Sequence, residues 1–409
     1  MSFVPATAPA SPLRPHGSRQ GGVRQYNERV VLQAIRQHGA IAGADLARLT
    51  GLTAQTVSLI TKRLLEDGLL RKGDPVRGKV GQPSVPLALD ADGAFTIGIK
   101  VGRRSMDLLL LDFAGQVRQR SSLRHAFPDP DELLPEIERQ VEAFRASLPV
   151  AQRERLQGIG IAAPLSLGGW HALLEVDAAV AEKWNHVDLS ERVGRATGLP
   201  VHFVKDTAAA CVAELVAGQG RSVRSFLYVF VDTFIGGGLV IDSHLRAGLH
   251  GNAGAVGSLA QHAPAPGARE APPQLLGVAS LQNLELLFRA ADLDTGAAAD
   301  ERALQPPWEP HTRRWIAQAA PAIALAVQQA ACLLDLDGVI VDGSFGRSLL
   351  AALLPALDEA LSGYCWEGVA RPPVHAGSIG PDARALGGAL LPLHANFSPD
   401  RDLFLKLDR

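Results

Sequence analysis

The chain has 409 residues, 47% hydrophobic and 20% charged, a composition typical of a globular protein with two or three domains and not of a fibrous, coiled-coil or wholly disordered one. Its three cysteines are too few for a disulfide framework or a thiolate zinc cage. The net charge of −2 hides an asymmetry, since residues 1–90 carry 12 Lys and Arg against 6 Asp and Glu, whereas residues 91–409 carry 28 against 36.

This distribution predicts that a basic head meets a polyanion and that an acidic body does not. We find no signal-peptide core at the N-terminus and no apolar run of the roughly 18 residues that a spanning helix needs. We therefore expect a cytoplasmic protein without a membrane partner.

Residues 1–22 are rich in Pro, Ala, Gly and Ser and predict a flexible arm, which is either a simple tail or a segment that touches DNA. Residues 23–90 predict a winged helix-turn-helix domain. Asn27 can cap a first helix that ends at Gly39, and residues 44–49 form a second helix. After a tight turn at residues 50–52, Thr53 can cap a third helix that ends at Gly68. The spacing of the apolar residues predicts that its inward face carries Val57, Ile60, Leu64 and Leu65.

Short strands near residues 69–72 and 85–89 complete the predicted wing. Small polar side chains near the start of a recognition helix can reach base edges in the major groove, and basic wing residues can contact phosphates or the minor groove. The candidate DNA-binding residues are Ala54, Gln55, Thr56, Ser58, Thr61 and Lys62 on the third helix and Arg77, Lys79 and Gln82 in the wing. The alternative is a helical module that binds protein.

Beyond residue 92 the sequence alternates strands with helices. Two apolar strand pairs, at residues 95–101 with 106–113 and at 226–231 with 237–241, look like one supersecondary unit used twice. Each pair is followed by a turn and then by helical segments. We therefore expect two lobes of the same design around a cleft.

Several glycine-rich segments of the body match the pattern of one known family. Three glycines at 236–238 follow a strand and precede Gly248, Gly251, Gly254 and Gly257. Further segments lie at residues 158–164 (G-I-G-I-A-A-P), 199–206 (a strand that ends in K-D), 339–344 and 386–389. From Arg24 onward the chain resembles the ROK (repressor, ORF, kinase) family of sugar kinases and sugar-responsive repressors.

The resemblance implies an α/β protein in which an N-terminal winged helix-turn-helix precedes a two-lobed, actin-like ATPase fold. It implies a first lobe over residues 91–205 and a second over 206–409. It also implies a C-terminal helix near residues 382–394 that packs back on the first lobe.

Phosphoryl transfer needs a phosphate cradle with Mg²⁺, a base and a sugar pocket. Kinases of the family open with D-x-G-G-T, where this chain has Lys100, Val101, Gly102, Arg103 and Arg104. The metal-binding carboxylate is therefore missing. Lys100 and Arg103 could bind phosphate by charge, but we interpret them as solvated turn residues. In the second phosphate loop, Phe234 fills space that a phosphate would need, and Asp232 adds negative charge.

The sugar and zinc elements of the family are replaced as well. The family's G-E-x-G-H segment corresponds here to residues 254–258, with Ala255 and Ser258 in place of its Glu and His, and the glutamate that ends its cysteine cluster falls at Leu276. No cysteine lies between Cys211 and Cys332. We therefore expect no metal and no cofactor, because the spacing of His244, His250 and His262 fits no familiar site.

Asp206 matches the family's catalytic base, and in this chain it can act as an effector contact, a helix cap or a vestigial base. The candidate effector residues are Lys205, Asp206, Ala255 and Ser258, and we assign no catalytic residue.

The leading interpretation is a DNA-binding transcriptional regulator, most simply a repressor, with a catalytically inactive sugar-kinase-like body. It would bind a double-stranded operator as a homodimer or a dimer of dimers and respond to a sugar-like or other small metabolite. The alternatives are a sugar kinase that carries a DNA-binding head and a scaffold that binds other proteins.

Overall fold

The computed structural model describes residues 20–75, 85–169, 176–264, 266–267 and 270–399. The head begins with α1 (Gln20–His38), α2 (Gly43–Thr50) and α3 (Ala54–Glu66), followed by the antiparallel strands β1 (Leu70–Lys72) and β2 (Leu87–Leu89). This is the predicted winged helix-turn-helix order. The predicted start of the first helix was wrong, because α1 begins at Gln20, so that Asn27 lies inside it and residues 20–22 are not part of an arm.

The turns of the head follow from local residue chemistry. The Thr53 hydroxyl accepts a hydrogen bond from the backbone N–H of Thr56 at 3.2 Å, which confirms Thr53 as the N-cap of α3. Gly51 between α2 and α3, with φ +68°, and Gly68 after α3, with φ +69°, adopt the left-handed conformation that a side chain disfavours. The buried side chains of the three helices form the head core, which includes Val31, Ile35, Leu46, Val57, Ile60 and Leu64.

The body contains two five-stranded sheets with the same strand order. The first sheet has the order β5-β4-β3-β6-β7, and the second has the order β10-β9-β8-β11-β12. In each, three antiparallel strands are followed by two parallel ones, which confirms the predicted repeat. The strands are β3 (Phe95–Val101), β4 (Ser105–Asp112), β5 (Val117–Arg124), β6 (Leu156–Ala163), β7 (Val201–Lys205), β8 (Phe226–Val231), β9 (Gly236–Ile241), β10 (His244–Arg246), β11 (Gly338–Gly343) and β12 (Val374–Ala376).

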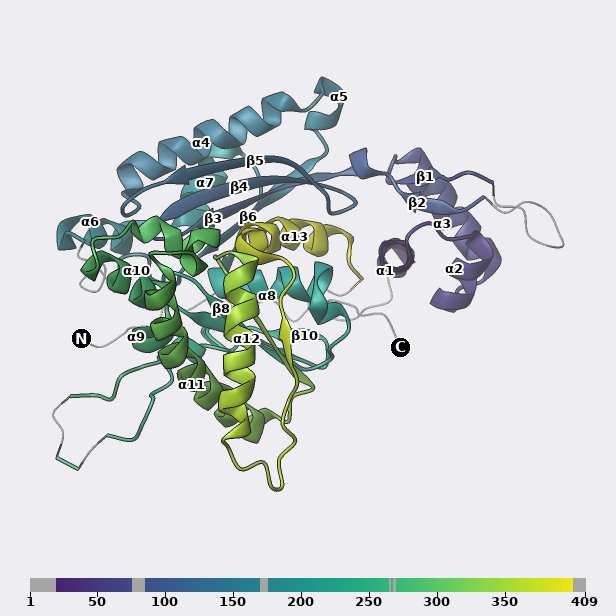
Figure 1. The fold of residues 1–409 in the computed structure, drawn as a ribbon. Helices are drawn as coiled ribbons and strands as arrows, with labels where there is room; N and C mark the ends of the chain where they lie inside the picture. The colour runs from purple at the N-terminus through teal and green to yellow at the C-terminus, as the bar shows by residue number, and fades with distance from the viewer. Residues whose placement is uncertain (1–19, 76–84, 170–175, 265, 268–269, 400–409) are drawn as a thin grey trace.

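Helices cover the outer faces of both sheets and fill the space between them (Figure 1). The helices of the first lobe are α4 (Pro130–Ser147), α5 (Val150–Arg153), α6 (Ala178–Lys183) and α7 (Leu189–Thr197). Those of the second are α9 (Leu276–Ala279), α10 (Leu281–Ala290), α11 (Glu309–Leu334) and α12 (Arg347–Ser362). Two helices, α8 (Asp206–Ala217) and α13 (Ala383–Phe397), pack against each other, and α13 also lies on β3 and β6.

The close approach of α13 to the first sheet depends on glycine. A Cβ atom on Gly98 would lie 1.9 Å from the Ala385 carbonyl oxygen, and one on Gly160 would lie 1.8 Å from that of Gly388. Thr96 donates its hydroxyl to the Ala389 carbonyl oxygen at 2.8 Å, although these residues are far apart in the sequence. Helix α13, the last one in the described part of the chain, is thus seated on the first lobe.

The head is attached to the same region of the body. Arg36 of α1 donates to the carbonyl oxygen of Phe113 at 2.9 Å and lies over its ring, and burial lowers the pKa of Arg36 to about 10. Phe113 also contacts the ring of Phe397 in α13 at 4.7 Å between centroids. Nη1 of Arg155 bridges the carbonyl oxygens of Gly68 and Asp92, at 3.2 Å each. Contacts from α1, the first lobe and α13 therefore meet at one junction.

The expectation that no segment is long and apolar enough to span a membrane was wrong for α11. This helix has 26 residues and contains an 18-residue window with a mean hydropathy of 1.4, half of which is buried. Trp315, Ala319 and Ile323 of α11 are fully buried, and the helix packs along α12. In the described structure α11 is therefore a core helix of the second lobe. A helix buried in a protein core needs an apolar composition similar to that of a membrane-spanning helix.

Candidate functional site

One face of α3 presents the polar side chains expected of a recognition helix. Ala54, Gln55, Ser58 and Lys62 are exposed on it, and Thr56 is half-buried with its hydroxyl 2.8 Å from that of Thr53. On the wing, Arg71 and Lys72 are exposed in β1, whereas the predicted contacts Arg77, Lys79 and Gln82 lie outside the described residues.

The assignment of Thr61 to this face was wrong. Its side chain is 7% exposed, and its hydroxyl donates to the Val57 carbonyl oxygen at 2.9 Å. Because residues four apart lie on the same side of a helix, Thr61 belongs to the stripe of Val57 and Leu64 that faces the head core. Because threonine is polar, the sequence did not indicate that position 61 belongs to the core.

The turn between β3 and β4 is held by an internal ion pair. Lys100 is only 4% exposed, and its ammonium donates to Ser105 Oγ at 2.5 Å and to Asp107 Oδ2 at 2.9 Å. Burial lowers the pKa of Lys100, and the nearby Arg384 adds to this effect. The interpretation of Lys100 as a solvated turn residue was therefore wrong, since its charge is neutralised within its own hairpin.

The corresponding turn of the second sheet contacts the first turn directly. The Arg103 guanidinium lies over the Phe234 ring at 5.0 Å from its centroid and donates through Nη2 to the Ser166 carbonyl oxygen at 3.2 Å. Phe234 lies between β8 and β9, so this contact joins the two lobes. Arg103 was also expected to be a solvated turn residue, and this was wrong because the aromatic ring covers it.

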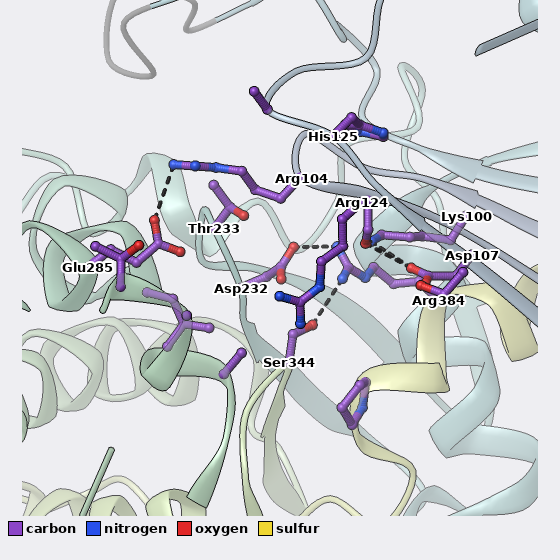
Figure 2. Close-up of a pocket in the computed structure, with 18 of the residues that line it drawn as sticks. Lys100, Arg104, Asp107, Arg124, His125, Asp232, Thr233, Glu285, Ser344 and Arg384 are labelled. Carbon is purple, nitrogen blue, oxygen red and sulfur yellow. Dashed lines mark hydrogen bonds and ion pairs between the residues drawn. The ribbon is translucent and has the colours of Figure 1, made fainter. Parts of the chain in front are cut away.

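Asp232, which directly follows β8, forms an ion pair with Arg384 at the start of α13 (Figure 2). Nη2 of Arg384 also donates to Ser344 Oγ at 2.9 Å. Burial acts to raise the pKa of Asp232, but Arg384 and Lys100 outweigh it and hold this pKa below its usual value. Asp232 is thus an ionised acceptor that anchors α13 to the second sheet.

A cavity of about 650 Å³ lies between the lobes above this ion pair. Its walls combine the β3–β5 hairpins of the first lobe with α10, Ser344 and the start of α13 (Figure 2). Arg104 spans it, donating through Nη2 to Glu285 Oε2 of α10 at 3.1 Å. The charged residues that line it are Lys100, Arg104, Arg124, Arg384, Asp107, Asp232, Glu285 and Asp382.

Sequence reasoning missed most of this lining. Arg124, His125, Glu285 and Arg384 belong to no recognisable motif, and they meet only because strands and helices from both lobes converge there. Only Arg124 has a local signal. It lies two residues after Ser122, so both side chains point to the same exposed face of β5.

The four candidate effector residues are not among those that line the inter-lobe cavity. Lys205 donates to Asn252 Oδ1 at 2.7 Å, and Asp206 accepts from the Thr207 backbone N–H at 2.8 Å as the first residue of α8. Ser258 is exposed, whereas Ala255 lines a separate apolar hollow beside the end of α11. Their shared role in binding an effector stays a prediction.

Within the described ranges, no group of three or more His, Cys, Asp or Glu side chains is arranged to hold a metal ion. His244 and His262 instead pair through Nδ1 with the carbonyl oxygens of Asp242 and Ala263, at 2.6 Å and 2.8 Å. The expected absence of zinc remains a prediction for elemental analysis.

Comparison with known proteins identifies both parts of the chain. Residues 96–271 match the model of the ROK family, and residues 24–71 match the winged helix-turn-helix DNA-binding model. The chain is 26% identical to the protein y4fQ of Sinorhizobium fredii over 374 residues, 91% of each chain. It is 25% identical to the xylose repressor of Bacillus subtilis over 58% of this chain and 61% of the relative. It is 26% identical to the transcriptional repressor Mlc of Escherichia coli over 54% and 55%.

Solved structures share this fold. A ROK family transcriptional regulator homologous to Escherichia coli Mlc superposes with a TM-score of 0.69 and 22% identity, over 92% of this chain and 98% of that one. A ROK family glucokinase from Streptomyces griseus superposes with a TM-score of 0.58 and 20% identity, over 73% and 99%. The regulator thus covers nearly all of this chain, whereas the kinase covers about three quarters of it. The matches to the two named repressors span 61% and 55% of their length.

Proposed function

Because the chain is a member of the ROK family with a winged helix-turn-helix head, we propose that it is a sequence-specific DNA-binding transcriptional repressor. The observation that carries this proposal is the exposed polar face of α3, with Gln55, Ser58 and Lys62, behind a capped tight turn and beside a basic strand. Such a face suits major-groove contacts. Relatives that bear the names xylose repressor and N-acetylglucosamine repressor support it.

We further propose that the protein binds its operator as a homodimer and that a carbohydrate effector controls it. Helix-turn-helix dimers contact half-sites about 34 Å apart, so a two-fold symmetric operator is expected. The names of the relatives support a carbohydrate effector. A cytoplasmic location is consistent with this function.

The proposal includes the loss of phosphoryl transfer. The Lys100–Asp107 pair stands where the family's kinases hold a metal-binding carboxylate, and the Arg103–Phe234 contact fills the space between the two loops. Asp206 could still accept a proton, but a base requires a positioned hydroxyl and a neutralised phosphate. The alternative of a sugar kinase with a DNA-binding head is favoured only by Asp206 and by the kinase fold of the body.

The test of DNA binding is fluorescence anisotropy of the full chain on DNA from the promoter beside its own gene. Gln55→Ala and Ser58→Ala should each weaken binding to the true site by about 1–3 kcal/mol and binding to random DNA by less. The matched control is Thr61→Val, which changes a buried position of the same helix and should leave operator affinity unaltered. If neither exposed variant loses affinity, the recognition face is misassigned, and absence of binding by the wild type would favour a protein-binding scaffold.

Catalysis is tested separately by ADP release with a panel of hexoses and amino sugars, for the wild type and Asp206→Asn. We expect no sugar-dependent turnover in either. Sugar-dependent turnover that Asp206→Asn abolishes would establish the kinase alternative.

A further inference from the structure

The lining of the inter-lobe cavity carries four cations and four carboxylates, but only three of these carboxylates pair with cations of the lining. Asp107 pairs with Lys100, Asp232 with Arg384 and Glu285 with Arg104, while Asp382 pairs with Arg120 outside the cavity lining. Each carboxylate of the lining is therefore already engaged by one cation. The remaining charged lining residue is Arg124.

Arg124 is exposed, and in Figure 2 its side chain extends from the end of β5 toward Asp232 and Ser344. Among the described residues, no carboxylate oxygen lies within 4.0 Å of its guanidinium. Its charge acts on Asp300, which is already held by Arg302. A guanidinium that lines a cavity and forms no ion pair there offers a bidentate site for a carboxylate or a phosphate.

Further polar atoms at the cavity wall lack partners. Arg104 Nε, Arg384 Nε and His125 Nδ1 are buried and have no hydrogen-bond partner among the described residues. Because His125 Nε2 must donate to the Gly102 carbonyl oxygen, at 2.9 Å, the neutral ring leaves Nδ1 as an acceptor. Burial lowers the pKa of His125, which keeps the ring neutral. The wall thus offers donors for an anion and an acceptor for a hydroxyl.

The lining disfavours a nucleotide. Its apolar members are the small or aliphatic residues Ala126, Leu281, Ala299 and Pro381, and its described lining contains no Phe, Tyr or Trp ring on which a base could stack. Hydroxyl groups of Ser122, Thr233 and Ser344 lie instead among the charges. A ligand that carries hydroxyls along its whole length matches this lining, because a buried polar group is costly unless it finds a partner.

We propose that the inter-lobe cavity binds a small anionic carbohydrate, a sugar phosphate or a sugar acid, with its anionic group on Arg124 and Arg104. This inference rests on the proposed function in that the ligand would be the effector of the repressor. The anionic group competes with Glu285 for Arg104, so binding replaces the contact that joins α10 to the first lobe. The ligand also lies beside Arg384 at one end of α13, and at the other end Phe397 contacts Phe113, the residue on which Arg36 of the head packs.

The test is isothermal titration calorimetry of the full chain without DNA. The probes are glucose 6-phosphate, glucosamine 6-phosphate and glucuronate, each compared with its neutral parent sugar, together with ATP and inorganic phosphate. We expect at least one anionic sugar to bind at least about tenfold more tightly than its parent and than inorganic phosphate. A preference for the phosphate esters or for glucuronate then identifies the anionic group.

Two variants in the cavity and one control test whether the ligand binds there. Arg124→Gln should weaken binding about tenfold or more, because it removes a charge-assisted contact. Arg195→Gln, which makes the same charge change on the exposed surface of α7, should leave affinity unchanged. Glu285→Gln should tighten binding, because it removes the carboxylate that competes for Arg104.

The proposal is overturned if no anionic sugar binds, if the neutral parent binds equally well, or if Arg124→Gln has no effect. ATP binding more tightly than every sugar would assign the cavity to a nucleotide, and equal binding of inorganic phosphate would show an unspecific anion site. These results do not depend on the promoter assay, so failure of either proposal is recognisable on its own.

Discussion

The two sheets of the body share one strand order, but the turns that follow their first strands carry opposite charge. The β3–β4 turn contains Arg103 and Arg104 beside the buried Lys100, whereas the β8–β9 turn contains Asp232 and Phe234. The turns meet through the stack of Arg103 on Phe234. The two sheets therefore share their strand order but differ in the residues of these turns, and the differing residues contact each other.

The turns also differ in where their charges find partners. Lys100 is neutralised by Asp107, seven residues away on the same hairpin. Asp232 is neutralised by Arg384, 152 residues away at the start of α13. The Lys100 pair is thus local to its hairpin, while the Asp232 pair depends on the docking of α13.

The largest effect should come from breaking the long-range pair. Arg384→Met leaves Asp232 ionised and half-buried without its partner, and we expect a loss of about 3–5 kcal/mol in the free energy of unfolding. Urea denaturation followed by circular dichroism measures this loss. The double variant Arg384→Met with Asp232→Asn should recover more than half of it, and a loss below about 1 kcal/mol in the single variant would show that the pair does not anchor α13.

Displacing α13 from the first sheet should have the next largest effect. Gly160→Ala places a Cβ against the Gly388 carbonyl oxygen, which belongs to the backbone and can move only with the helix, so we expect about 2–3 kcal/mol of destabilisation. The control is Gly277→Ala, where no atom lies within 4 Å of the new Cβ. Equal urea midpoints for the two variants would contradict the close packing of α13.

Breaking the local pair should cost less. Lys100→Met leaves Asp107, which is 30% exposed and still accepts hydrogen bonds from Ser105 and Ser122, so we expect about 1–2 kcal/mol. Lys183→Met, which breaks an exposed ion pair on the surface of the same lobe, should cost less than Lys100→Met in the same assay. A loss for Lys100→Met as large as that for Arg384→Met would remove the distinction between the two turns.

The smallest expected effect is a pH dependence from His125, beside the first turn. Burial holds its pKa below the unfolded value of 6.5, so below about pH 6.5 the unfolded chain binds more protons than the folded chain. Stability should therefore fall as pH falls from 6.5 toward the folded pKa of His125. Urea midpoints between pH 5 and 7.5 should show a shallower slope for His125→Asn, and an unchanged slope would assign the effect to other groups.

Local sequence patterns were sufficient for much of this structure. Alternating apolar residues and glycine turns predicted β3, β8 and the order of the head elements, and the side chain of Thr53 alone defined the cap of α3. The pattern was insufficient where residue type and position disagree, as at Thr61, whose hydroxyl is satisfied inside its own helix. It also missed the true start of α1, because Asn27 is compatible with a helix interior as well as with a cap.

The sequence by itself determined the two-part organisation, the repeated strand pairs and the likeness to the ROK family, because each is recorded in patterns a few residues long. Only the tertiary structure decided that Lys100 is buried, that Arg103 covers Phe234 and that Arg104 reaches Glu285, 181 residues further along the chain. The sequence does not show whether a charged side chain is hydrated by water or paired with a carboxylate far along the chain. The difference arises only when folding removes the water and brings the partner within hydrogen-bonding distance.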